Sequence, residues 1–190
     1  MGKEDMGKEI VKQPNKKAKI LKSEIIYRGQ AFGVRRDELI EPTGVRTIRE
    51  VVTHPGSVVV LPVLPDGRIV MVRQYRHATG QYLWELVAGR LEPGENPKKG
   101  AQRELIEETG YRARTWSKLA SFWVSPGYVQ ERMTIYLATD LTAGVATPMD
   151  DERIETRWFT RKELAEMIGD GKIEDAKTMV GFYAWQARKG

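Results

Sequence analysis

The stretch that decides the fold runs from Gly89 to Tyr111 and reads GRLEPGENPKKGAQRELIEETGY. Asn96 suits the N-cap of a helix, and Pro97 suits its first position, where no amide hydrogen bond is lost. Gly110 suits the left-handed residue just past a helix end. We therefore expect a helix over 97–109, preceded by a loop of turn-forming residues.

Three glutamates of the expected helix share one face. Side chains three and four residues apart are neighbours on a helix, so Glu104, Glu107 and Glu108 form one acidic patch. Close carboxylates repel one another unless a cation lies among them, and an all-oxygen site with room for water suits Mg²⁺ or Mn²⁺. A solvated charged face is the ordinary alternative, but it does not require the glycine and arginine residues that frame this helix.

The same stretch resembles the Nudix box, G-x5-E-x7-R-E-U-x-E-E-x-G-U, in which U is a bulky apolar or aromatic residue. Every fixed position is met, by Gly89, Glu95, Arg103, Glu104, Glu107, Glu108 and Gly110. Downstream, the run Ser125-Pro126-Gly127 followed by Glu131 resembles the signature of the ADP-ribose pyrophosphatase branch of the Nudix hydrolase superfamily. The resemblance extends over the whole chain from about Ile20.

The resemblance implies a catalytic metal site and names its residues. The metal ligands would be the backbone carbonyl of Ala88 and the carboxylates of Glu104, Glu107, Glu108 and Glu152. Arg103 would brace the carboxylates, while Gly89 and Glu95 would shape and hold the loop behind them. The general base is expected on the acidic loop near residue 150, where Glu152 is favoured and Asp150 is the open alternative.

Substrate contacts are implied at positions outside the box. Arg49, Glu50, Arg76, Ser125 and Glu131 match such positions, and Phe32, with Tyr27 as an alternative, is the expected aromatic partner of adenine. The planar fork of arginine suits phosphate oxygens, although a surface ion pair is the alternative reading of each arginine. The resemblance implies that the N-terminal sheet is exchanged or packed across a two-fold dimer, so Arg49 is expected to serve the neighbouring subunit's site.

The implied reaction is hydrolysis of ADP-ribose to AMP and ribose 5-phosphate. Divalent cations would neutralise the diphosphate and lower the pKa of the attacking water, whose proton the loop carboxylate would take. Two alternatives stay open: a hydrolase of another nucleoside diphosphate sugar such as GDP-mannose, and a non-catalytic nucleotide-sugar sensor. The intact carboxylates Glu104, Glu107 and Glu108 favour an enzyme over a sensor.

Composition is typical of a cytoplasmic enzyme without disulfides. The chain has 190 residues, 41% of them hydrophobic, no cysteine and two histidines, which excludes thiol catalysis and zinc-thiolate sites. The longest apolar run, 58–64, is too short to cross a bilayer, and no signal-peptide pattern opens the chain. Most of the net charge of +5 comes from residues 1–22, with seven lysines against three acidic residues, so nucleic acid is not an expected partner.

Three regions are expected from these patterns and from the resemblance. We expect a flexible Lys-rich tail over 1–18, a β-sheet subdomain for homodimerisation over 19–54 and a Nudix hydrolase domain over 55–190. The expected fold class is α/β, and the resemblance implies a Nudix-type α/β/α sandwich with a mixed sheet, preceded by a small antiparallel sheet. Strands are expected over 20–27, 32–39, 45–53, 57–64, 68–75, 82–88, 114–123, 133–139 and 155–159. Later helices are expected after the capping box 160–163 and within 175–188.

Overall fold

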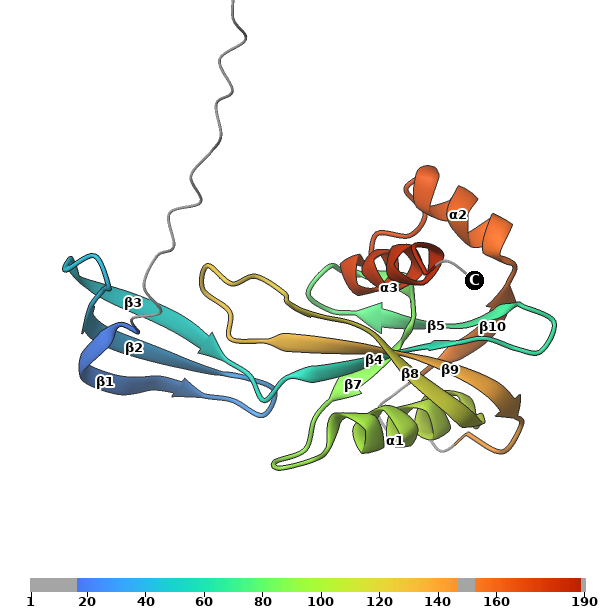
Figure 1. Cartoon of the computed structure of the whole chain (residues 1–190), viewed down its shortest axis with the longest axis horizontal. Helices are drawn as coiled ribbons and strands as arrows, with labels where there is room; N and C mark the ends of the chain where they lie inside the picture. Colours follow the sequence, from blue (N-terminus) through green and yellow to red (C-terminus); the bar gives the residue numbers. More distant parts are fainter. Residues whose placement is uncertain (1–16, 147–152, 189–190) are drawn as a thin grey trace, which may run out of the picture. The chain divides into compact units, whose positions relative to one another are not determined.

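The computed structural model describes residues 17–146 and 153–188. Within them the chain forms two compact units, with the boundary between Val51 and Val52. Figure 1 shows the order of the elements along the chain. No helix in the described part of the chain is long and apolar enough to span a membrane.

The N-terminal unit is a small three-stranded sheet. Its strands, in the spatial order β1-β2-β3, are β1 (Lys19–Arg28), β2 (Gly33–Ile40) and β3 (Arg46–Thr53), the last of which continues into the second unit. β1 and β2 pair antiparallel, and the amide of Gly29 donates to the carbonyl of Phe32 at 2.9 Å in the turn between them. Every residue of β1 is exposed, so this sheet has little core of its own.

The C-terminal unit holds two further sheets and three helices. One antiparallel sheet has the order β10-β5-β6, and a four-stranded mixed sheet has the order β7-β4-β9-β8, in which only β4 and β9 run parallel. The strands are β4 (Ser57–Pro62), β5 (Ile69–Arg76), β6 (Gln81–Glu85), β7 (Val87–Arg90), β8 (Arg112–Trp123), β9 (Arg132–Thr142) and β10 (Glu155–Phe159). The helices are α1 (Pro97–Thr109), α2 (Arg161–Gly169) and α3 (Ala176–Gln186).

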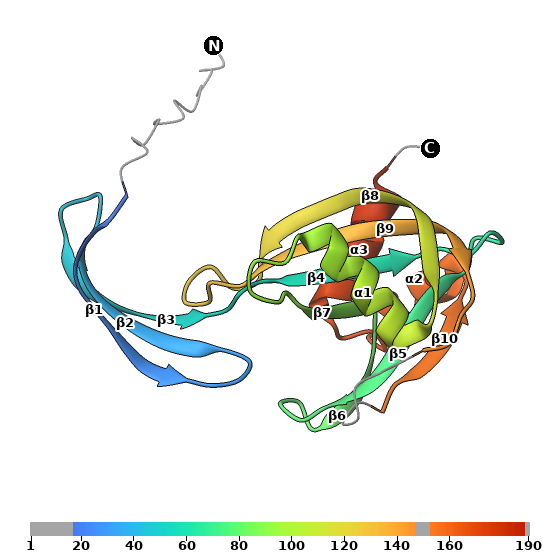
Figure 2. The same ribbon diagram turned by 90° about the horizontal axis from the view of Figure 1, so that it is seen from below.

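Helices lie on both faces of the mixed sheet. Figures 1 and 2 show α1 along one face and α3 on the other. The strand β4 is buried throughout because both of its faces are covered: Val59 and Leu61 belong to one core cluster with Phe182 of α3, and Val58 belongs to another with Leu105 of α1. This is the expected α/β/α sandwich with a mixed sheet.

One prediction is wrong: a single expected strand is two strands that belong to different sheets. The run 82–88 is not a single strand but divides at Leu86, so that β6 pairs with β5 while β7 pairs with β4. Leu86 is fully buried, and its amide donates to the hydroxyl of Thr178 at 2.8 Å instead of to a neighbouring strand. The break depends on a residue of α3 that lies 92 positions away in sequence, so local patterning could not indicate it.

Candidate active site

The helix α1 begins and ends where the sequence predicts. The side chain of Asn96 accepts hydrogen bonds from the amides of Lys98 and Lys99, and Gly110 adopts the left-handed conformation with φ of 73°. Ala101 and Leu105 are fully buried toward the sheet. Because Ala101 and Leu105 pack against the sheet, the orientation of α1 is set. Glu104 and Glu108 lie one turn apart on this helix, and both are buried.

Arg103 holds three carboxylates around one guanidinium group. Its Nη1 donates to Oε1 of Glu104 at 2.7 Å and to Oε2 of Glu107 at 2.9 Å, while Nε donates to Oε1 of Glu95 at 3.0 Å. The hydrogen bond with Glu95, with smaller contributions from the other two carboxylates, raises the pKa of Arg103 further above its ordinary value. Arg103 is therefore charged and acts as an internal counter-ion for the box.

Glu95 ties the preceding loop to α1. Its Oε2 accepts from the amide of Glu92 at 3.0 Å and from Nη2 of Arg103 at 3.1 Å, and the same Nη2 also donates to the carbonyl of Arg90 at 3.2 Å. The hydrogen bond from Arg103 lowers the pKa of Glu95 below its ordinary value. These contacts are the geometry expected of a loop-holding residue.

Glu104 lies directly against the end of β7. A Cβ atom added to Gly89 would fall 1.9 Å from the carboxyl carbon of Glu104, so the strand can approach this carboxylate only where it lacks a side chain. Ala88, whose carbonyl was the expected backbone ligand, is the preceding residue of β7 and pairs with Val59 of β4. The structure thus brings Gly89 against Glu104, with Ala88 as the preceding residue of the strand.

The chemistry of this donor set fits a hard divalent cation. The residues that would hold it are Glu104, Glu107, Glu108 and the Ala88 carbonyl, all of which offer oxygen. Within 17–146 and 153–188, no three carboxylate or imidazole groups converge closely enough to hold a metal ion. Two of the carboxylates that would hold the cation, Glu104 and Glu107, are instead bound to Arg103.

Both candidates for the general base, Glu152 and Asp150, lie outside the described residues.

Arg76 lies at the end of β5 and is held by a carboxylate. Its Nε and Nη2 donate to the two oxygens of Glu85, each at 2.7 Å. The hydrogen bonds with Glu85 are the largest cause of a raised pKa of Arg76, and the negative charge of Glu108 contributes to the same shift. Arg76 therefore lies within electrostatic reach of the box helix.

Ser125 and Glu131 lie at the two ends of the connection between β8 and β9. The carbonyl of Ser125 accepts from the amide of Val129 at 2.9 Å, which closes a turn. Oε1 of Glu131 accepts from the hydroxyl of Ser57 at 2.6 Å and lies 3.7 Å from Nδ1 of His54. Glu131 thus joins the start of β9 to the segment that enters β4.

The remaining expected substrate residues belong to the N-terminal unit. Arg49 donates to Glu41 at 2.6 Å, and Glu50 accepts from Arg36 at 2.7 Å, so both carry surface ion pairs within their own sheet. The ring of Phe32 lies 5.8 Å from that of Tyr27, centroid to centroid, in a tilted arrangement. The two rings that the sequence offers for adenine are therefore neighbours.

Comparison with known proteins identifies the family. A family model described as NUDIX domain matches residues 53–182, and the chain belongs to this family. It is 36% identical to an ADP-ribose pyrophosphatase of Bacillus subtilis over 162 residues, which cover 84% of this chain and 88% of the relative. It is 37% identical to an ADP-ribose pyrophosphatase of Mycobacterium tuberculosis over 171 residues, 88% of this chain and 82% of the relative.

Two further relatives bear on the fold and on the alternative substrate. The crystal structure of an ADP compounds hydrolase superposes with a TM-score of 0.78 at 25% identity, covering 90% of this chain and 93% of that one. A GDP-mannose pyrophosphatase of Yersinia enterocolitica is 32% identical over 148 residues, 73% of this chain and 77% of the relative. The resemblance and the fold class inferred from the sequence are confirmed, and hydrolases of this family generally need a divalent metal.

Proposed function

We propose that this protein is a metal-dependent pyrophosphohydrolase that cleaves ADP-ribose to AMP and ribose 5-phosphate, with Mg²⁺ as its cation and Mn²⁺ as a substitute. The proposal rests on one arrangement: Arg103 donates hydrogen bonds to Glu104 and Glu107, and the carboxylate of Glu104 lies against the backbone of Gly89. The relatives named ADP-ribose pyrophosphatase are 36–37% identical to this chain, whereas the GDP-mannose pyrophosphatase is 32% identical. ADP-ribose is therefore the substrate we favour.

Each residue of the site has a distinct task in this reaction. A bound cation would supply charge neutralisation at the diphosphate and a lowered pKa of the attacking water. Arg103 holds Glu104 and Glu107 in position, and Arg76 offers its positive charge to the diphosphate. Glu152, or Asp150 in its place, takes the proton of the water. Positioning and electrostatic stabilisation then supply most of the rate enhancement.

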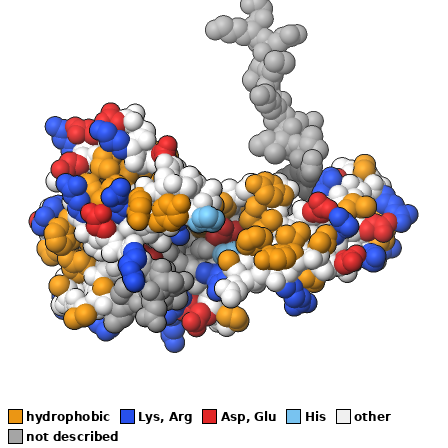
Figure 3. Space-filling model, turned by 180° about the vertical axis from the view of Figure 1, so that it is seen from behind, with side chains coloured by type: hydrophobic (Ala, Val, Ile, Leu, Met, Phe, Trp, Pro, Cys, Tyr) orange, Lys and Arg blue, Asp and Glu red, His pale blue; other side chains and the backbone are white. Residues whose placement is uncertain are grey.

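We also propose that the sheet of residues 19–54 packs against a second copy of the chain in a homodimer with shared active sites. Apolar side chains gather on the N-terminal unit, as the space-filling view shows (Figure 3). They include Ile20, Leu21, Ile25, Ile26, Phe32 and Ile48, each at least 41% exposed. Every residue of β1 is exposed, and a second copy packed against the sheet would bury the apolar face that a stable sheet requires. Arg49, Glu50 and Phe32 would then contact substrate in the partner's site.

The decisive experiment is a panel of nucleoside diphosphate sugars with Mg²⁺ or Mn²⁺, in which the products are identified by chromatography. The proposal requires ADP-ribose to give the highest kcat/KM, with AMP and ribose 5-phosphate as products and no turnover after chelation of the metal. A higher kcat/KM for GDP-mannose would replace the proposed substrate. Binding without hydrolysis of any sugar would favour the sensor.

A further inference from the structure

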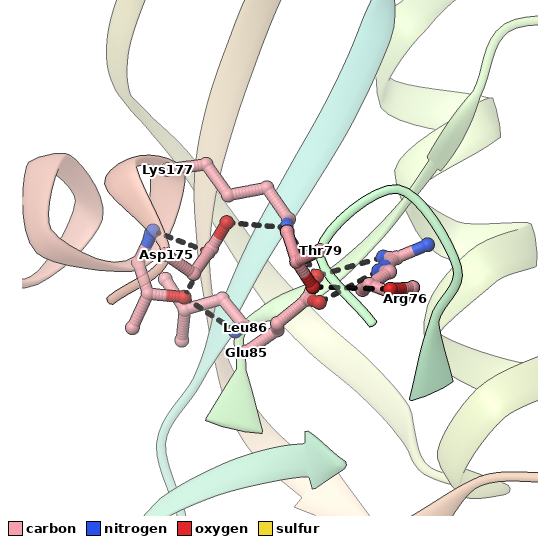
Figure 4. A network of polar contacts seen from close by, with 7 residues as sticks. Arg76, Thr79, Glu85, Leu86, Asp175 and Lys177 are labelled. Carbon is pink, nitrogen blue, oxygen red and sulfur yellow. Dashed lines mark hydrogen bonds and ion pairs between the residues drawn. The ribbon is translucent and has the colours of Figure 1, made fainter. Parts of the chain in front are cut away.

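A row of alternating charges, buried at Glu85 and Lys177, leads from α3 to the partly exposed side chain of Arg76. Glu85 is 1% exposed, accepts both hydrogen bonds from Arg76 and is also contacted by the ammonium group of Lys177. Nζ of Lys177 lies 2.8 Å from Oδ1 of Asp175, the N-cap of α3. Figure 4 shows the side chains lying in sequence from Asp175 through Lys177 and Glu85 to Arg76.

Glu85 determines which edge of the Arg76 guanidinium remains available. A guanidinium carries five N–H donors in one plane. Nε and Nη2, which form the side edge of the guanidinium, each donate one hydrogen bond to Glu85. The end-on edge, formed by Nη1 and the second hydrogen of Nη2, keeps the geometry that binds two oxygens of a phosphate.

The first turn of α3 holds Glu85 through two neighbouring contacts. Lys177 binds the carboxylate itself, and the hydroxyl of Thr178 accepts from the amide of the next residue, Leu86, at 2.8 Å. That hydroxyl in turn donates to Oδ2 of Asp175 at 2.6 Å. The end of β6 is therefore fixed to α3 in both its side chain and its backbone.

Stability alone does not account for this arrangement. Burial by itself raises the pKa of Glu85, but the hydrogen bonds and charges of Arg76 and Lys177 outweigh it and the pKa lies below its ordinary value. Glu85 is thus ionised in the interior, at a desolvation cost that its partners offset. Well-packed apolar residues commonly stabilise a core equally well. What they cannot do is orient a guanidinium.

We propose that Glu85 and Lys177 are positioning residues for substrate binding, which fix the side edge of Arg76 so that its end-on edge faces the diphosphate of the substrate. The proposal rests on the proposed function, in which Arg76 contacts that diphosphate. Neither residue touches substrate. Their effect on catalysis passes through Arg76.

The test is a double-mutant cycle on the full-length protein with ADP-ribose and Mg²⁺. We expect Glu85→Gln to raise KM about 10-fold, because a released guanidinium loses a charge-assisted phosphate contact, while kcat changes less than about threefold. In an Arg76→Ala background the same substitution should change KM less than about twofold, since the group being positioned is gone. The Mg²⁺ concentration for half-maximal activity should stay at the parent value.

A second pair of variants covers the case in which Glu85→Gln does not fold. Lys177→Met leaves the Glu85–Arg76 pair and the hydrogen bond between Leu86 and Thr178 intact but removes the side-chain contact with α3, so KM should rise by a smaller factor, about threefold. Lys177→Arg keeps the charge and should restore most of the parent KM. Melting temperatures of all variants verify that they are folded.

The outcomes separate this proposal from the proposed function. If the parent cleaves ADP-ribose but the Glu85 or Lys177 substitutions leave KM unchanged, or raise it equally with and without Arg76, the positioning role is overturned and the function stands. If the parent hydrolyses none of the nucleoside diphosphate sugars, the function fails and the positioning role falls with it.

Discussion

The backbone of Gly89 and the carboxylate of Glu104 are in such close contact that no side chain fits between them. A Cβ atom at position 89 would lie 1.9 Å from both Cδ and Oε1 of Glu104, whereas carbon atoms in contact normally stand about 3.5–4.0 Å apart. The added Cβ atom would clash with the carboxylate of Glu104, which is buried and hydrogen-bonded to Arg103. The strand end and the carboxylate therefore behave as one unit.

Replacing Gly89 with alanine should displace the Glu104 carboxylate and leave most of the fold intact. Because a displacement of about 1 Å in a catalytic group can cost about 100-fold in rate, we expect kcat/KM for ADP-ribose to fall by at least 10-fold. Steady-state kinetics and a melting curve measure the two effects. Gly169→Ala is the matched control, because a Cβ there meets nothing within 4 Å; equal activities of the two variants would contradict the prediction.

Glu108→Gln should abolish turnover with little loss of structure. The amide has the shape of the carboxylate, so it opens no cavity, but it removes one negative charge from the proposed metal site. Activity should fall at least about 100-fold, in keeping with the loss of a catalytic metal ligand. Glu166→Gln on the exposed surface of α2 is the control. A Glu108 variant with the parent's rate and metal dependence would show that α1 does not hold the catalytic metal.

Shared active sites predict complementation between two impaired variants. Arg49→Ala and Glu108→Gln should each be impaired alone, because one lacks a substrate contact and the other a metal ligand. After mixing and refolding, some heterodimers should contain one site free of both changes and regain activity. Native mass spectrometry verifies the mixed dimers. If they form and are no more active than the two parents together, the sites are not shared.

Low pH should lower the free energy of unfolding, in part because Glu85 becomes protonated. Its pKa in the folded protein lies below the ordinary value of 4.5, so its contribution to the free energy of unfolding is complete above that pH. The contribution is lost as the pH falls from 4.5 through the lower folded pKa. The melting temperature of the parent should therefore fall more steeply below about pH 4.5 than that of Glu85→Gln. Parallel slopes for the two proteins would contradict this assignment.

The elements with strong local signals were predictable from the sequence. The helix α1 has the predicted bounds because Asn96 and Gly110 act within a few residues of its ends. The capping box at the start of α2 forms as predicted, with Thr160 and Glu163 bonded to each other's backbone amides. The strand at 155–159 is likewise exact. In each case, side chains close in sequence determine the boundary.

What the sequence could not predict depends on contacts between distant residues. The break at Leu86 needs Thr178, and the burial of Glu85 needs Lys177 on the same helix. The residues around Glu85 in the sequence do not indicate that its cationic partner, Lys177, lies 92 positions later. Helical spacing predicted the acidic patch of Glu104, Glu107 and Glu108, and the resemblance to the Nudix box implied their roles, whereas the partners of Glu85 became visible only in three dimensions.

The exposed strand β1 has a consequence for folding during synthesis. It is an edge strand whose exposed residues include Ile20, Leu21 and Ile25, and it leaves the ribosome before any residue of the C-terminal unit. Exposed apolar edges invite pairing with other unfinished chains. Lys19 and Lys22, which lie on the same edge, oppose such pairing because they bring like charges together. The edge strand therefore carries positive charge beside its apolar residues while the chain is still incomplete.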